Sequence, residues 1–141
     1  FYYGPIHDGT NGVVAFSEFP AYYIGTEVQG ARLEFRDGKV VDASAQSGED
    51  FLLQILDSDE GARTLGEMGI GCNHRITRHM KNTLYDEKID GTVHFALGAG
   101  LPETGATNES AVHWDMVKDL RSGGRIICDG EVVQEDGRWL F

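Results

Sequence analysis

Asp-Gly dipeptides between short runs of branched and aromatic residues constrain the fold more than any other feature of this sequence. Asp37-Gly38 separates Ala31–Arg36 from Lys39–Ser44, and Asp-Gly readily supplies the positive φ angles of a type I′ turn. Asp129-Gly130 and Asp136-Gly137 repeat the arrangement near the other end of the chain. The pattern therefore predicts several antiparallel hairpins.

The remaining segments complete a β-dominant prediction. Strands are expected over Gly12–Phe19, Gly91–Gly98, Glu109–Leu120, Ile126–Asp129 and Glu131–Gln134. A helix is expected through Phe51–Leu56 after a capping box formed by Ser47 and Asp50, a second over Ser58–Leu65, and helix or irregular structure over Arg78–Asp86. The predicted class is α+β, a bent antiparallel sheet with hairpins and two or three short helices, in one domain spanning residues 1–141.

Charge and cysteine content narrow the classes of function. The 141 residues include 12 Lys and Arg against 23 Asp and Glu, a formal net charge of −11. This acidity argues against nucleic acid or an anionic membrane as the partner, because both attract basic patches. No run approaches the roughly 18 apolar residues of a membrane helix. Cys72 and Cys128 are too few for a disulfide framework, and a reducing cytoplasm is the expected compartment.

His113-Trp114-Asp115 is the first candidate for chemistry. In a strand, side chains at i and i+2 leave the sheet on the same side. His113 and Asp115 should therefore point together, and Trp114 should point into apolar packing. An imidazole beside a carboxylate is a pair of metal ligands or an acid/base pair. A core histidine held by a neighbouring acid is the structural alternative.

Two further residues extend this pair. His94 shares the small-residue face of its strand with Ala96, opposite an apolar face. Glu67 lies in Leu65–Gly71, where three glycines permit close backbone approach; a surface carboxylate in a glycine-rich loop is the alternative interpretation. Glu67, His94, His113 and Asp115 together offer two imidazoles and two carboxylates, which suits zinc, cobalt or manganese better than calcium or magnesium.

Other residues are weaker candidates. Cys72, His74 and His79 cluster within eight positions, but their spacing matches no usual zinc pattern. Asp86-Glu87-Lys88 is interpreted as a structural ion pair in a tight turn. Four tyrosines are candidates for a dimer surface or for contacts with a further domain: Tyr2, Tyr3, Tyr22 and Tyr23.

Several longer motifs resemble the C-terminal part of the thermophilic aminopeptidase family, which includes aminopeptidases T and S. They are Gly12-Val-Val-x-Phe16, Leu33-Glu-Phe-Arg-Asp-Gly-Lys-Val-Val41, Leu65-Gly-Glu-x-Gly-Ile-Gly-x-Asn73, Leu84-Tyr-Asp-Glu-Lys-Ile89, Gly91-Thr-x-His-x-Ala-Leu-Gly98, Pro102-Glu-Thr-Gly105, Asn108-Glu-Ser110 and His113-Trp-Asp115. The resemblance covers essentially the whole chain.

The resemblance implies a cytoplasmic, homodimeric metalloaminopeptidase that removes N-terminal residues from peptides with two divalent metal ions. It places Glu67, His94, His113 and Asp115 on the metal-binding positions, with Glu67 as ligand, proton acceptor or both. The family's first metal-binding glutamate falls before Phe1, in a preceding N-terminal domain, and Leu101 stands where members often carry tyrosine. We therefore expect the isolated chain to be inactive or weakly active. The alternative is a non-catalytic metal-binding or oligomerisation domain that keeps only the fold.

Overall fold

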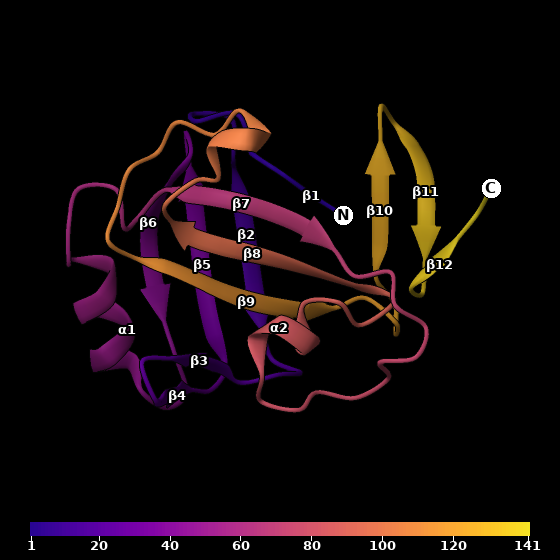
Figure 1. Ribbon diagram of the computed structural model, residues 1–141, viewed down its shortest axis with the longest axis horizontal. Coiled ribbons are helices and arrows are strands. Elements are labelled where there is room, and N and C mark those ends of the chain that lie inside the picture. The colour runs from indigo at the N-terminus through magenta and orange to yellow at the C-terminus, as the bar shows by residue number, and fades with distance from the viewer.

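Two antiparallel sheets form the body of the protein in the computed structural model, which describes all 141 residues. The first has the order β1-β7-β8-β9, formed by Tyr2–Tyr3, Leu65–Ile70, Thr92–Gly98 and His113–Asp119. The second has the order β2-β5-β6, formed by Gly12–Phe16, Ala31–Arg36 and Lys39–Ser44. Strands of the first sheet run crosswise over those of the second (Figure 1).

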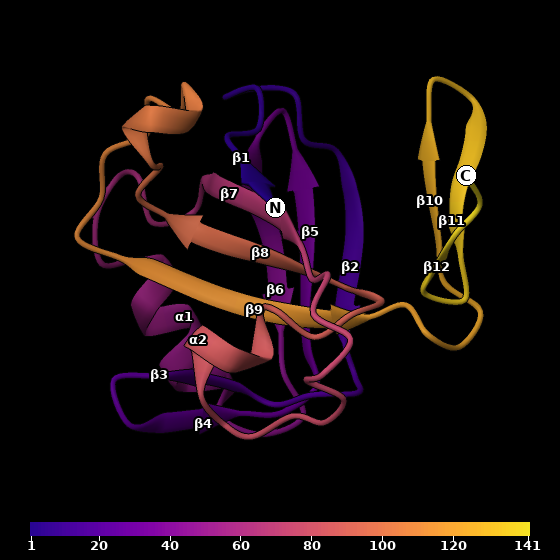
Figure 2. The ribbon, with the colours of Figure 1, turned by 45° about the vertical axis from the view of Figure 1, so that its right-hand side comes forward.

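Smaller elements surround these sheets. They are the hairpin β3 (Ala21–Tyr23) and β4 (Thr26–Val28), helices α1 (Glu49–Leu56) and α2 (Thr83–Asp86), and the 3₁₀ turn η1 (Pro102–Thr104). Strands β10 (Arg125–Cys128), β11 (Glu131–Glu135) and β12 (Arg138–Trp139) form a third sheet. This sheet projects from the body as a separate arm (Figure 2). No helix of the structure is long and apolar enough to span a membrane.

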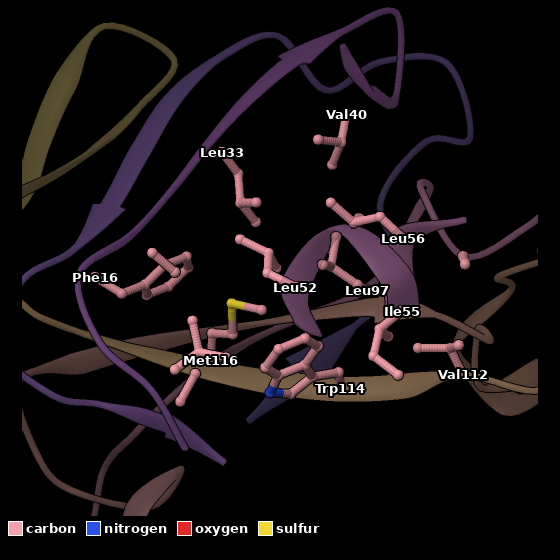
Figure 3. Packing of buried hydrophobic residues seen from close by; sticks show 14 of the residues in the cluster. Phe16, Leu33, Val40, Leu52, Ile55, Leu56, Leu97, Val112, Trp114 and Met116 are labelled. Carbon is pink, nitrogen blue, oxygen red and sulfur yellow. The ribbon is translucent and has the colours of Figure 1, made fainter. Parts of the chain in front are cut away.

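The hydrophobic core fills the space between the two main sheets. Phe16 and Leu33 approach from the second sheet, and Leu97 and Trp114 from the first (Figure 3). Helix α1 closes one end of the core with Leu52, which is fully buried. Since the inner face of β8 and β9 is committed to this core, their outer face is left for polar side chains.

The predicted class and hairpins are confirmed. Strands β5 and β6 pair across Asp37-Gly38, where both residues have positive φ, 49° and 82°. Strands β10 and β11 pair across Asp129-Gly130, and β11 and β12 across Asp136-Gly137. The one departure in the first hairpin is a bulge between Glu34 and Phe35.

The capping box predicted before α1 is wrong. The N-cap is Gly48, with φ of 79°, and no side chain caps the helix. A β-carbon at Gly48 would approach the carbonyl oxygen of Glu27 to 2.9 Å. The left-handed backbone and this close contact with Glu27 both favour glycine at the helix start. Glu49 instead accepts a hydrogen bond from the amide of Ala45.

The helix predicted over Ser58–Leu65 is absent, and this segment forms turns. Asp59 explains the difference, because its side chain accepts bonds from the amides of Gly61 and Ala111 and from the hydroxyl of Ser110. These bonds favour a tight turn over a helix. They also tie down residues 110–111, so that β9 begins at His113 rather than at Glu109.

Two other boundaries differ from the prediction. Strand β2 ends at Phe16, whose partner Ala31 is the first residue of β5, so no paired backbone continues to Phe19. Leu65–Ile70 is a buried strand and not a loop. Glycine is uncommon in strands, so the sequence of this segment does not indicate one. Glycine is needed at residue 66 because a β-carbon there would clash with the carbonyl oxygens of Gly98 and Ala99.

Candidate metal centre

Three neighbouring strands place the candidate residues on one face of the first sheet. Glu67 in β7 is paired with Ala96 in β8, which in turn is paired with Asp115 in β9. Paired residues point to the same side of a sheet, and the small side chain of Ala96 leaves room between the two carboxylates. His94 lies two residues before Ala96, and His113 two residues before Asp115, so both share this face.

The four side chains contact one another. Nε2 of His94 lies 3.3 Å from Oε1 of Glu67, and Nε2 of His113 lies 3.3 Å from Oε2 of the same residue. Nε2 of His113 is also 3.4 Å from Oδ2 of Asp115. Glu67 is therefore the centre of the cluster, with one carboxylate oxygen directed at each histidine.

The cluster atoms that do not face one another differ in whether they have a hydrogen-bond partner. Nδ1–H of His113 donates to the carbonyl oxygen of Ala99 at 2.9 Å, which fixes its ring and directs Nε2 towards the carboxylates. By contrast, Nδ1 of His94 and Oδ1 of Asp115 are buried without a hydrogen-bond partner in the protein. Buried polar atoms without partners are uncommon in native proteins and often mark functional sites.

Contacts within the cluster shift two pKa values. Hydrogen bonds from His113 and then His94 lower the pKa of Glu67 to about 2, although burial opposes them. Hydrogen bonds to Asp115 and then Glu67 raise the pKa of His113 to about 11. Without metal, a protonated His113 thus holds the two carboxylates together at neutral pH.

The donor set fits a transition-metal ion. One ligand atom each from Glu67, His94 and Asp115 lie within 4.8 Å of one another. Mixed imidazole and carboxylate donors favour zinc, cobalt or manganese over the all-oxygen shells of calcium and magnesium. The two unpaired buried atoms and the fixed ring of His113 agree with this chemistry.

The second cluster considered from the sequence does not assemble. His74 pairs with Asp90 at the surface, His79 pairs with Asp86, and Cys72 is a free, exposed thiol. Asp86-Glu87-Lys88 is predicted to form a structural ion pair in a tight turn, and Glu87 and Lys88 form that pair without Asp86.

Asp86 is instead a buried anchor beside the cluster. Its carboxylate accepts bonds from the amides of Met80, at 2.6 Å, and Asn82, at 2.8 Å, and lies 3.2 Å from Nε2 of His79. Between these amides Lys81 has a φ of 61°. A cavity of about 20 Å³ separates this loop from β9; it is lined by Pro20, Tyr22, His79, Lys81, Thr83, Asp86, Asp115 and Val117. The loop thus borders the cluster along β9.

Gly69 is a further residue of the site that the sequence only hinted at. It is paired with His94 across β7 and β8, and a β-carbon there would overlap the His94 ring. The glycines of Leu65–Gly71 had indicated close approach in general, but not which group approaches.

A β-rich domain that gathers two imidazoles and two carboxylates on one sheet face has a donor set that could hold a metal ion. The chain belongs to the thermophilic metalloprotease (M29) family, whose model matches residues 1–139. The geometry groups Glu67, His94 and Asp115 as possible ligands, and His113 contacts both carboxylates of that group.

Curated relatives are aminopeptidases. Aminopeptidase 2 of Geobacillus stearothermophilus is 36% identical over 161 residues, covering 97% of this chain. Aminopeptidase AmpS of Bacillus subtilis is 32% identical over 160 residues, and aminopeptidase T of Thermus aquaticus 32% over 157. The chain spans only 38% of the length of each of these relatives.

Solved structures agree on the fold. Wild-type AmpT from Thermus thermophilus superposes with a TM-score of 0.79 at 30% identity, covering 99% of this chain and 39% of that one. A 2,5-dihydroxypyridine dioxygenase from Pseudomonas putida KT2440 superposes with a TM-score of 0.77 at 16% identity, which demonstrates a shared fold alone.

Proposed function

We propose that this chain is the metal-carrying, C-terminal catalytic-type domain of a metal-dependent aminopeptidase, which hydrolyses N-terminal residues from peptides. The observation that carries the proposal is the convergence of Glu67, His94, His113 and Asp115 on one sheet face. The aminopeptidase names of the curated relatives support the reaction class.

The proposed cofactors are two divalent ions, zinc, cobalt or manganese. Glu67 is the proposed shared ligand, because its two oxygens face different histidines. Such ions, when bound, would supply a water molecule of lowered pKa and a Lewis acid for the scissile carbonyl. The protein contributes by holding its ligands rigidly: β7, β8 and β9 fix the backbone, and the carbonyl of Ala99 fixes the ring of His113.

Glu67 has a second proposed role, as proton acceptor. Its carboxylate is ionised at neutral pH, since its pKa is lowered to about 2 by the two histidines. It is also buried, with 6% of its surface exposed, so that a proton held there is shielded from bulk water. A divalent cation bound beside it would favour the ionised carboxylate as well.

The setting of the domain is proposed from the same relatives. Because they are longer, we propose that an N-terminal domain precedes this one in the parent chain and supplies another metal ligand. We also propose that the parent protein is a homodimer and lies in the cytoplasm. The exposed free thiols of Cys72 and Cys128 are compatible with a reducing compartment. Leu101 is the N-cap residue that precedes η1, and its side chain cannot donate a hydrogen bond to a reacting carbonyl.

The test starts with metal binding. We expect the chain to bind Co²⁺ with a visible d–d spectrum, Glu67→Gln to lose it, and His74→Gln, at an exposed histidine outside the cluster, to keep it. Failure of the wild-type chain to bind Co²⁺ or Zn²⁺ would contradict the proposed metal centre.

Activity is then assayed with an aminoacyl-p-nitroanilide and Co²⁺ or Zn²⁺. We expect little turnover above metal alone from the 141 residues, and chelator-sensitive turnover when the chain is joined to its proposed N-terminal domain. Robust hydrolysis by the 141 residues would overturn the expected dependence on that domain. No hydrolysis by the joined protein would overturn the aminopeptidase proposal.

A non-catalytic oligomerisation domain is the second candidate, and the β10–β12 arm favours it. Ile127 in β10 is 61% exposed, and Leu140 and Phe141, which follow β12, are 57% and 93% exposed. Exposed apolar residues that gather on a projecting element can mark an interaction surface. Metal binding without turnover in the joined protein, combined with self-association that is lost in Ile127→Ser, would favour this function.

A further inference from the structure

The ring of His94 occupies the space that a side chain at residue 69 would fill. Gly69 and His94 are paired across β7 and β8. A β-carbon built on Gly69 would overlap Cε1 and Nε2 of the imidazole and lie 3.0 Å from Nδ1. The ring of His94 therefore reaches over Gly69 in β7.

The backbone itself does not require glycine here. Residues with positive φ include eleven glycines, but Gly69 is not among them. Its backbone conformation is open to alanine, and the three atoms nearest to a β-carbon at this position all belong to the imidazole of His94. A contact with one ring, and not a turn or a strained φ, is the reason for this glycine.

The overlapping atoms are at the end of the ring that faces the cluster. Nε2 of His94 lies 3.3 Å from Oε1 of Glu67, yet His94 is paired with Gly69 and not with Glu67. To reach a residue two positions along the neighbouring strand, the ring must cross β7 diagonally. The absence of a side chain at residue 69 opens this diagonal path.

The ring has little freedom to move elsewhere. His94 is 3% exposed, and its other strand partner, Val117, is 7% exposed. A methyl group at residue 69 would have to displace Nε2 from Glu67 or push β7 away from β8. Either movement separates two atoms of the proposed ligand set.

We propose that Gly69 is a positioning residue, which holds Nε2 of His94 towards Glu67 and so towards a divalent cation. The inference rests on the metal centre of the proposed function and adds to it the residue that orients one of its ligands. Outer groups that orient metal ligands typically contribute about 10–100-fold to affinity.

The first test is metal affinity by Co²⁺ titration. We expect Gly69→Ala to weaken the Kd by roughly 10–100-fold and to alter the d–d spectrum. Met68→Ala is the matched control: Met68 is the preceding residue of β7, points to the other face and accepts a hydrogen bond from Tyr3. It should lower stability without changing the Kd. A Kd for Gly69→Ala within twofold of wild type would overturn the proposal.

A double-mutant cycle separates positioning from general damage to the sheet. If Gly69 acts through His94, then Gly69→Ala should add nothing to the loss of affinity already caused by His94→Ala. Additive losses would mean that residue 69 acts by another route, and would overturn the proposal.

A metal-free measurement keeps the inference distinct from the proposed function. The ring ¹⁵N chemical shifts of His94 should move in Gly69→Ala and stay unchanged in Met68→Ala. If the wild-type chain binds no Co²⁺, the proposed metal centre is contradicted, and the His94 shifts alone then test whether Gly69 positions the His94 ring. Unchanged His94 shifts in Gly69→Ala would overturn the role of Gly69.

Discussion

The ionised form of Glu67 and the protonated form of His113 stabilise each other. Glu67 is held ionised by the histidines, with its pKa lowered to about 2, and His113 is held protonated by Asp115 and Glu67, with its pKa raised to about 11. Each shift means that the folded state favours that charge more strongly than the unfolded chain does. The cluster therefore makes the stability of the metal-free protein depend on pH in both directions.

The pH dependence follows from the signs of these shifts. The stability from Glu67 is present above its ordinary pKa of 4.5 and declines as pH falls towards 2. That from His113 is complete below 6.5 and declines as pH rises towards 11. Urea unfolding with chelator present should therefore give a greater contribution of the cluster to stability between pH 4.5 and 6.5 than on either side.

His113→Gln is the matched variant for this measurement. It should flatten the decline on the alkaline side, because glutamine does not titrate. An unchanged alkaline decline in this variant would assign the effect to other groups.

At the scale of elements, two Asp-Gly turns have similar backbones but different surroundings. Gly38 and Gly130 have φ of 82° and 87°. A β-carbon at Gly38 would overlap the carbonyl oxygen of His7, whereas one at Gly130 would meet nothing within 4 Å. A β-carbon at either position would strain the backbone, but only at Gly38 would it also crowd a neighbouring segment.

Alanine at the two positions should therefore differ in its effect on unfolding. Gly130→Ala should cost about 1–2 kcal/mol, the penalty for a left-handed residue with a β-carbon. Gly38→Ala should cost at least 2 kcal/mol more, as an order-of-magnitude estimate, because the segment around His7 must also shift. Equal losses in urea unfolding would show that the crowding relaxes freely.

The loop anchored by Asp86 gives a second prediction for an element. Asp86→Ala leaves the amides of Met80 and Asn82 without their acceptor, and lost bonds to a buried carboxylate cost about 2–4 kcal/mol. Hydrogen exchange should show faster exchange at both amides. Lys88→Ala, which breaks the exposed pair with Glu87, should change stability by less than about 1 kcal/mol. Equal exchange in wild type and Asp86→Ala would contradict the anchoring role.

The sequence predicted those elements whose signals are local. Asp37-Gly38 determines its own hairpin, and the alternation around His113 and Asp115 orients their side chains correctly. Elements controlled by distant partners were misjudged. Asp59 accepts a hydrogen bond from Ser110, and residues 58–63 therefore form turns where a helix was predicted. Strand β7 contains glycines because groups from the neighbouring strand β8 occupy the space that their side chains would need. The register that pairs Gly69 with His94 has no local signal, so the orientation of that ring could not be predicted.

For the whole molecule, the candidate ligands come from three strands separated by long connections. Glu67 and Asp115 are far apart in sequence but share one register row across β8. No pair of these strands alone carries all four side chains. Metal binding should therefore require the folded sheet and, by linkage, should stabilise it.

The expected stabilisation is measurable by thermal unfolding. At ~100 times its Kd, a metal that binds only the folded state adds about 2.7 kcal/mol. For a chain of this size that corresponds to a Tm increase of roughly 5–10 °C. Glu67→Gln should lose the increase, and chelator should reverse it in the wild type. An equal increase in Glu67→Gln would mean that the metal binds elsewhere.

The pairing of Glu67 with Ala96 and of Ala96 with Asp115 also limits where residues can be inserted or deleted. An extra residue between His94 and Leu97 would turn either His94 towards the core or Leu97 towards the polar face, because the alternation is reversed on one side of the insertion. Extra residues between Gly98 and His113 would leave both strands in register, because that segment is a connection outside the sheet. The alignment with the Geobacillus relative extends over 161 residues, more than the 141 of this chain. We expect such insertions and deletions to accumulate in the connections, while the spacing from Glu67 to Gly69, from His94 to Ala96 and from His113 to Asp115 stays fixed.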